Sequence, residues 1–308
     1  MIRYFVMRLA LAIPTLLAII SLSFFLVRLA PGGPFDREQS LPAEIVVHLQ
    51  SAYGLDQPMG VQYLRYLRGL AHGDFGPSFK YRDFTVTELI AQGFPVTLKL
   101  GAAALCIALI LGILIGTFAA LKHNSAADYL TMSLAVVGIA VPSFVVLPFL
   151  GLLFGIYLHW LPVAGWEPGS FKHLVLPVAA LALPPLAYIA RLTRGSMLDA
   201  LRSHFVRTAV AKGLPLRRVI LRHALPPALM PVAGYLAPAV ASIMTGSLVV
   251  ESIAGLPGVG RYLVQGALNR DYTLVMGMVI LYSTVLIGMG LVVDLFYAWL
   301  DPRIRYAR

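Results

Sequence analysis

Six long stretches of the sequence contain no charged residue and are almost wholly apolar. They are Leu9–Val27, Leu100–Leu121, Tyr129–Leu158, Leu174–Ala190, Ala224–Val250 and Tyr272–Val293. A helix that crosses about 30 Å of hydrocarbon needs roughly 20 apolar residues, and each stretch approaches or exceeds that length. The pattern therefore predicts an all-α integral membrane protein with about six transmembrane helices.

We treat the chain as one transmembrane domain, 1–308. Its approximate spans are 9–29, 97–121, 129–157, 174–191, 226–250 and 273–297. The third run contains Pro142 and Pro148, and the fourth contains Pro177, Pro184 and Pro185. Proline removes a backbone donor and kinks helices, so we expect the third span to be broken and the fourth to be irregular.

The distribution of basic residues predicts the orientation. Most of the 24 Lys and Arg residues fall on one side of the membrane if the N-terminus is inside, and cytoplasmic loops carry such an excess. Both termini are then inside. Residues 31–94 form a periplasmic segment, 191–225 a cytoplasmic loop and 251–271 a glycine-rich outer loop. Within the periplasmic segment the pattern predicts two short amphipathic helices, Leu41–Tyr53 and Met59–Leu70.

Composition agrees with a membrane protein. The chain is 59% hydrophobic and only 12% charged, whereas soluble domains carry roughly 25% charged residues. The net charge of +10 resides in the loops, so topology explains it better than binding to nucleic acid, and we expect no nucleic-acid partner. The single cysteine, Cys106, lies in an apolar run and permits no internal disulfide.

Motifs for catalysis, metal binding and nucleotide binding are missing from the sequence. It has no G-x-x-x-x-G-K-[ST], H-E-x-x-H, C-x-x-C or G-x-S-x-G, and no two histidines are spaced by three or four residues. We therefore expect no catalytic residue, no metal and no cofactor, which argues against an intramembrane enzyme. The six runs also lack Lys, Arg, Asp and Glu, which argues against a secondary transporter driven by ions.

The segment Arg191–Arg222 is the most informative, with eight basic residues against one acid. A helix starting near Gly195 would gather one apolar face from Met197, Leu198, Leu201, Phe205, Val206 and Ala209. Gly213 and Pro215 would end it, and a second helix from Leu216 would stop at Pro226 and Pro227. This segment has three alternative roles: it could contact lipid headgroups, bind nucleic acid or dock a cytoplasmic partner.

The stretch FVRTAVAKGLPLRRVILRHALPPALMPV (Phe205–Val232) resembles the E-A-A-x3-G-x9-I-x-L-P loop of permease subunits from binding-protein-dependent ABC importers. Ala209, Gly213, Leu225 and Pro226 occupy matching positions. Arg207, Thr208 and His223 depart from the general pattern in a way that looks like the peptide and nickel branch. Further blocks resemble the B-type permease of oligopeptide systems: RLAPGGPF, GDFGPSFKY, VPSFVV, IARLTRGSM, GLPGVG, ALNRDY and DPRIRY.

The resemblance implies the type I ABC importer permease fold and a multi-pass subunit of the bacterial inner membrane that moves oligopeptides by alternating access. It implies a second homologous permease, two cytoplasmic ATPases that use ATP and Mg, and a periplasmic or lipid-anchored peptide-binding protein. Dipeptides, nickel or another small substrate remain the alternatives. The residues implied at the ATPase-coupling corner are Arg207, Thr208, Ala209, Lys212, Gly213, Leu225 and Pro226.

Overall fold

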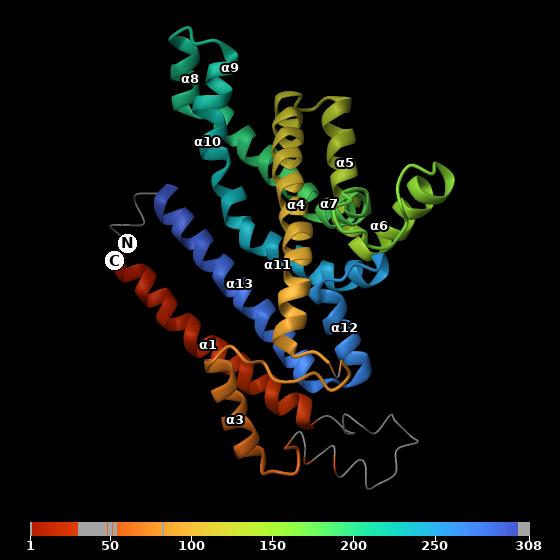
Figure 1. Cartoon of the computed structure of the whole chain (residues 1–308). Helices are drawn as coiled ribbons and strands as arrows, with labels where there is room; N and C mark the ends of the chain where they lie inside the picture. Colours follow the sequence, from red (N-terminus) through yellow and green to blue (C-terminus); the bar gives the residue numbers. More distant parts are fainter. Residues whose placement is uncertain (1, 30–47, 49–50, 52–53, 82, 301–308) are drawn as a thin grey trace. The chain divides into compact units, whose positions relative to one another are not determined.

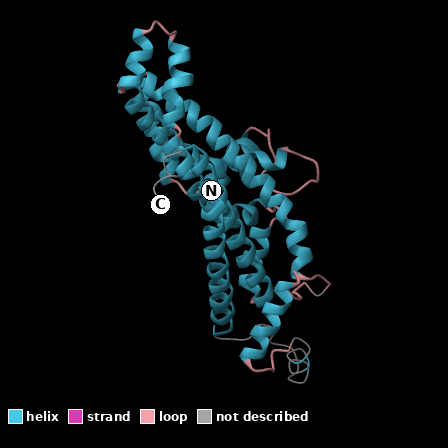
Figure 2. Ribbon diagram, turned by 90° about the vertical axis from the view of Figure 1, so that its left-hand side faces the viewer, coloured by secondary structure: helices cyan, strands magenta, loops and turns pink. Residues whose placement is uncertain are grey.

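The structure, a computed structural model, describes residues 2–29, 48, 51, 54–81 and 83–300. Within these residues every regular element is a helix (Figure 2). An isolated backbone bridge joins Pro77 to Thr85. Five of the described helices are long and apolar enough to cross a membrane, and a bent pair of helices makes up to six. The prediction of an all-α chain with about six candidate spans is confirmed.

The chain forms two compact units. One consists chiefly of Leu98–Leu256, and the other of Val6–Thr97 with Pro257–Ile287. Helix α7 (Lys172–Arg202) is central to the first unit, where it lies against α5 (Ala126–Ala140), α6 (Ser143–Leu150) and α11 (Met230–Ala254) (Figure 1). Its buried face is rich in alanine, and small side chains allow helix axes to approach closely.

Two glycines bring α4 (Val86–Leu121) against α7 in the same unit. A Cβ on Gly112 would lie 2.9 Å from the carbonyl oxygen of Leu186. A Cβ on Gly116 would overlap the carbonyl oxygen of Ala190 and lie 2.7 Å from Cβ of Thr193. Because these neighbours include backbone atoms, only glycine permits this separation of the two helices.

The third apolar run is broken as predicted. Helix α5 and the segment Ser143–Tyr157 meet at an angle of 107°. Val141, between them, is extended because a residue before proline is driven out of the helical region, and Pro142 follows it. The second half comprises α6 and the π-helical segment η1 (Gly151–Tyr157).

The fourth run differs from the prediction, because α7 is continuous through Pro177, Pro184 and Pro185. Pro177 and Pro185 are buried in the unit. Packing by neighbouring helices offsets the hydrogen bonds that prolines remove, so a proline count alone overestimates irregularity.

The second unit contains α1 (Ile2–Leu29), α3 (Met59–Ala71), α12 (Val259–Asn269) and parts of α4 and α13 (Tyr272–Leu300). Helix α3 packs on α1 through aromatic rings, with Phe24 fully buried 5.2 Å from the ring of Tyr63. The predicted helix Met59–Leu70 is thus confirmed, whereas Leu41–Tyr53 falls largely outside the described residues.

The segment 251–271, predicted as a glycine-rich outer loop, is mostly helical in the structure, and its place outside the membrane stays a prediction. Helix α12 occupies its centre, and Gly93 of α4 allows a close approach to the start of α12, where a Cβ would lie 3.1 Å from the backbone nitrogen of Val259. That nitrogen donates to Oγ1 of Thr97 at 3.0 Å. The glycines therefore lie at helix ends and at close contacts between helices, and the segment is not an extended loop.

Several helices are longer than the predicted spans. Helix α4 begins at Val86 rather than near residue 97, and α7 continues to Arg202 rather than 191. Helix ends do not mark the membrane surface, so the spans and the orientation stay predictions.

Candidate functional site

The cytoplasmic corner predicted from the sequence is a pair of short helices beyond the end of α7 (Figure 1). Ser203 is extended and separates α7 from α8 (His204–Ala211). Gly213 follows α8 with a φ of 75°, a left-handed conformation that glycine adopts without strain. Pro215 then precedes α9 (Leu216–Val219), which lies against α8.

The first predicted helix of this segment was misplaced at its start. No helix begins near Gly195, because α7 runs through that position to Arg202 and the break falls at Ser203. The break turns Phe205 outward, and its side chain is 50% exposed. Met197, Val206 and Ala209 are buried, so that part of the apolar face is confirmed.

The second predicted helix does not stop at its prolines, which is also a correction. After α9 the chain forms a π-helical turn, η2 (Ile220–Ala224), and then α10 (Leu225–Ala228). Pro226 and Pro227 occupy the first turn of α10, where a missing N–H costs least.

A small hydrophobic core holds the corner together. Met197, Val206, Ala209, Val219 and Ala224 are all at most 5% exposed and belong to one cluster. Leu214 and Leu225 pack against it from the side. The corner therefore has its own packed interior and can present its outer surface in a defined shape.

The outer surface of the corner combines basic and apolar side chains. Arg207, Thr208, Lys212 and Gly213 are exposed around the end of α8. Next to them in the chain, Val210 and Leu216 are 56% and 67% exposed. An apolar patch with cationic neighbours is suited to bind an acidic groove on another protein.

The seven predicted coupling residues are thus divided by their burial. Arg207, Thr208, Lys212 and Gly213 share the exposed end of α8. Ala209 is buried in the interior, Leu225 is partly buried against it, and Pro226 is exposed on α10. Throughout the described part of the chain no three His, Cys, Asp or Glu side chains are grouped so as to hold a metal ion.

Sequence reasoning missed an ion pair between α5 and α7. Arg194 of α7 donates from Nε to Oδ1 of Asp128 at 2.6 Å and from Nη2 to Oδ2 at 2.7 Å. Asp128 is 1% exposed, and its Oδ2 also accepts from the backbone nitrogen of Asn124 at 3.0 Å. The pattern Ser125-x-x-Asp128 is typical of a helix start, but a partner on another helix leaves no local signal.

Asp271 is a second buried carboxylate that the sequence did not single out. Its Oδ1 accepts from the backbone nitrogen of Leu274 at 3.1 Å, which caps α13. Its Oδ2 accepts from the backbone nitrogens of Phe79 and Lys80, at 3.0 and 3.2 Å, and from the hydroxyl of Ser78. One side chain therefore ties the loop Ser78–Lys80 to the start of α13. An aspartate before an apolar helix indicates the cap, but the loop contact is not visible in the sequence.

Comparison with known proteins identifies the class. Residues 112–306 match the family model "Binding-protein-dependent transport system inner membrane component", and residues 1–101 match the N-terminal model of the same transport systems. The chain belongs to this family. It is a multi-pass permease component of the inner membrane and not the catalytic subunit of its transport system.

Individual relatives match over nearly the whole chain. The oligopeptide transport system permease protein OppB of Escherichia coli K12 is 53% identical over 99% of this chain and 100% of its own length. The dipeptide transport system permease protein DppB of Bacillus subtilis is 44% identical over 99% and 98%. A crystal structure of an amino acid ABC transporter with histidines covers 69% of this chain and 94% of its own, with a TM-score of 0.53 and 19% identity, which supports the fold alone.

Proposed function

We propose that this chain is the permease subunit of an ATP-driven importer of oligopeptides. The observation that carries the proposal is the 53% identity, over 99% of the chain, to a permease named for oligopeptides. The dipeptide permease DppB is 44% identical over the same share, so dipeptides are the second candidate. Nickel or another small substrate is less favoured, because both of these relatives are peptide permeases.

We further propose that the corner around α8 is the site where an ATPase subunit transmits force. Arg207, Thr208, Lys212 and Gly213 form the contact surface. Ala209 and Leu225 maintain its shape, and Pro226 lies in the first turn of the helix that leads back toward the membrane. Two cytoplasmic ATPases would use ATP and Mg. A second homologous permease would complete the path, and a peptide-binding protein would deliver the substrate.

The topology belongs to the same proposal. Both termini and residues 191–225 lie inside, and residues 31–94 and 251–271 lie outside, with the six spans in one permease domain. The basic charge of the inner loop supports this orientation. The exposed apolar surface of the spans then meets lipid and the second permease.

The substrate is tested by uptake into proteoliposomes that contain the complete complex and its binding protein. We expect ATP-dependent uptake of labelled peptides longer than two residues, at a higher rate than dipeptides, and no uptake without the binding protein. Transport restricted to dipeptides would establish the second candidate. Transport of nickel alone would contradict both.

The coupling site is tested by replacing Gly213. Gly213→Asp adds a negative charge to the exposed cationic surface, and nothing lies within 4 Å of the position where its Cβ would be built. We expect peptide uptake to fall about tenfold or more, because a loss of ~1.4 kcal/mol in docking free energy weakens the affinity for the ATPase tenfold. Insertion and the amount of purified permease should not change.

The matched control is Gly213→Asn, which has the same shape as aspartate and also tolerates the left-handed conformation. Uptake by this variant should remain within about twofold of the wild type, because asparagine adds no negative charge to the cationic surface. Equal losses in both variants would indicate that backbone conformation matters and charge does not. Normal uptake by Gly213→Asp would exclude this corner as the coupling site.

A further inference from the structure

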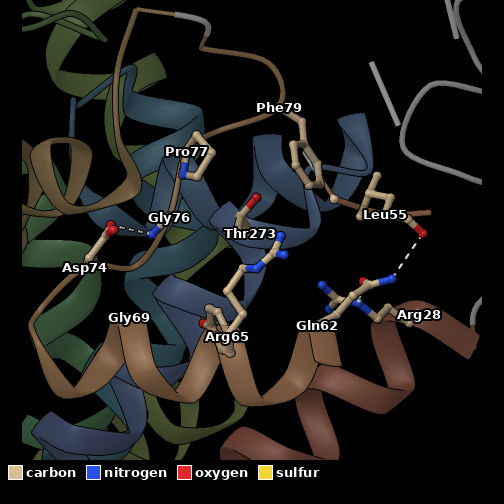
Figure 3. Close-up of a pocket in the computed structure, with 12 residues that line it drawn as sticks. Arg28, Leu55, Gln62, Arg65, Gly69, Asp74, Gly76, Pro77, Phe79 and Thr273 are labelled. Atoms are coloured by element: carbon tan, nitrogen blue, oxygen red, sulfur yellow. Dashed lines mark hydrogen bonds between the residues drawn. The ribbon is translucent and has the colours of Figure 1, made fainter. Parts of the chain in front are cut away.

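A cleft of about 290 Å³ lies within the second unit of the chain (Figure 3). The end of α1 lines it with Arg28, and α3 lines it with Gln62 and Arg65. The loop before α4 lines another side with Asp74. The cleft therefore brings two guanidinium groups and one carboxylate together.

Both guanidinium groups of the cleft are held in place by glutamines. Arg28 stacks 3.6 Å from the ring centre of Phe24 and donates from Nε to Oε1 of Gln62 at 3.0 Å. Gln62 in turn donates to the carbonyl oxygen of Gln57 at 2.8 Å. Arg65 donates from Nη2 to Oε1 of the same Gln57 at 2.6 Å. One hydrogen-bonded network thus orients both cations.

The charges that line the cleft are not paired with one another. Within the described part of the chain, no ion pair joins Arg28, Arg65 or Asp74 to an opposite charge. Arg65 and Asp74 are exposed, and Asp74 accepts one hydrogen bond, from the backbone nitrogen of Gly76 at 2.8 Å. Arginine binds phosphate with two parallel hydrogen bonds, and an ionised carboxylate has further lone pairs for an ammonium group. The lining therefore offers one place for a phosphate and another for an ammonium group.

The position of the cleft along α1 indicates which phosphate it meets. The hydroxyl oxygens of Ser21 and Tyr63 lie 2.6 Å apart, so α3 lies beside the last two turns of the apolar run Leu9–Val27. Arg28 is the first charged residue after that run. Around these turns α1 exposes large apolar side chains, namely Leu22, Leu26 and Leu29, at 62%, 57% and 70%. These side chains do not line the cleft, but on a membrane-spanning helix they meet lipid tails, which places the adjoining cleft at the level of the headgroups.

We propose that this cleft binds the headgroup of phosphatidylethanolamine, with the lipid phosphate at Arg28 and Arg65 and the primary ammonium group at Asp74. A lipid is favoured over a soluble ligand because the cleft adjoins the exposed apolar end of a span. A zwitterionic headgroup is favoured over an anionic one because the carboxylate of Asp74 repels a second negative charge.

This lipid site goes beyond the proposed function, because it depends on the membrane location of the chain and not on its substrate. The proposed topology assigns the bound lipid to the outer leaflet. The lipid would join the end of α1, α3 and the loop before α4 through one headgroup.

The experiment uses the complete complex in phosphatidylcholine nanodiscs that contain a small fraction of photoactivatable phosphatidylethanolamine, with its diazirine near the glycerol. After illumination, mass spectrometry quantifies the lipid attached to peptides from residues 54–81, which include α3 and the following loop. We expect unlabelled phosphatidylethanolamine to displace this label about tenfold more effectively than phosphatidylglycerol, because only the former carries an ammonium group for Asp74.

Variants test whether the label depends on the cleft. Arg65→Gln removes a cation from the lining, and Arg68→Gln removes one from an exposed position of α3 that does not line the cleft. We expect labelling to fall about tenfold in Arg65→Gln and less than about twofold in Arg68→Gln, with unchanged thermal unfolding in both. Arg65→Lys keeps the charge and should be labelled more than Arg65→Gln.

Asp74→Asn tests the ammonium half of the site. Asparagine keeps an oxygen that can accept from the backbone nitrogen of Gly76 but carries no negative charge. The preference for phosphatidylethanolamine over phosphatidylglycerol should therefore disappear in this variant, because nothing then distinguishes the two headgroups by charge.

Four results would overturn the inference. Equal labelling of the wild type and Arg65→Gln would exclude the cleft, and equal losses in Arg65→Gln and Arg68→Gln would indicate only a general positive potential. Displacement of the label by inorganic phosphate or free phosphoethanolamine as effectively as by the lipid would assign the cleft to a soluble ligand. An unchanged lipid preference in Asp74→Asn would contradict the ammonium site.

A peptide control separates this inference from the proposed function. Displacement of the label by a transported peptide would assign the cleft to the substrate, and the lipid site would be wrong. If the wild-type complex transports no peptide but labelling follows the expected pattern, the proposed function fails and the lipid site stands.

Discussion

Replacing Gly116 by leucine is expected to separate α4 from α7 and to destabilise the larger unit. The Cβ alone would overlap the carbonyl oxygen of Ala190, and a backbone atom on a packed helix cannot rotate away. The two helices must move apart, and overpacking of this kind costs about 1–3 kcal/mol or more. Thermal unfolding of the purified permease in detergent, compared with the wild type, measures the loss.

The control for this change is Gly195→Leu on α7. No atom lies within 4 Å of a Cβ built at Gly195, and the residue is exposed. We expect a change within about 0.5 kcal/mol, because surface positions tolerate substitution. Gly112→Ala should give an intermediate loss, since its Cβ would lie 2.9 Å from the carbonyl oxygen of Leu186. Equal stability of Gly116→Leu and the wild type would contradict the close packing.

Replacing Asp271 by alanine is expected to release the loop Ser78–Lys80 and to uncap α13. The change leaves two backbone nitrogens and one hydroxyl of the loop without their acceptor, and each buried unsatisfied group costs about 1–3 kcal/mol. We expect the free energy of unfolding to fall by about 3 kcal/mol or more. Limited proteolysis between residues 73 and 85 should become faster.

Asp74→Ala provides the comparison within the same loop. Asp74 is exposed and accepts one backbone bond, from Gly76. Its loss should cost about 1 kcal/mol or less, because water replaces an exposed acceptor. If both aspartate variants lose equal stability, the burial of Asp271 is not what holds the loop.

The membrane helices were predictable because an apolar run must reach a minimum length to cross the hydrocarbon core of the bilayer. Six runs gave six candidate spans, and the bend before Pro142 followed from the backbone preference of the residue that precedes proline. The continuity of α7 was not predictable in the same way. Whether Pro184 and Pro185 break a helix depends on which neighbours pack around them, and that information is spread over the chain.

The candidate corner was predictable in outline but not in its details. The basic residues, Gly213 and Pro215 marked two helices and a turn. The break at Ser203 and the π turn before Pro226 depend on packing of Val206, Val219 and Ala224 into one core. Asp128 and Asp271 were missed for the same reason, because their main partners lie on distant segments and leave only helix-start patterns in the sequence.

The pair of Asp128 and Arg194 also constrains how the chain is made. Arg194 lies 66 residues after Asp128, so at 5–20 residues per second the ribosome adds it roughly 3–13 s later. A buried carboxylate without its partner costs several kcal/mol. During insertion, α5 must therefore wait for α7 before it takes its final place, and the order of synthesis becomes part of the assembly of this membrane protein.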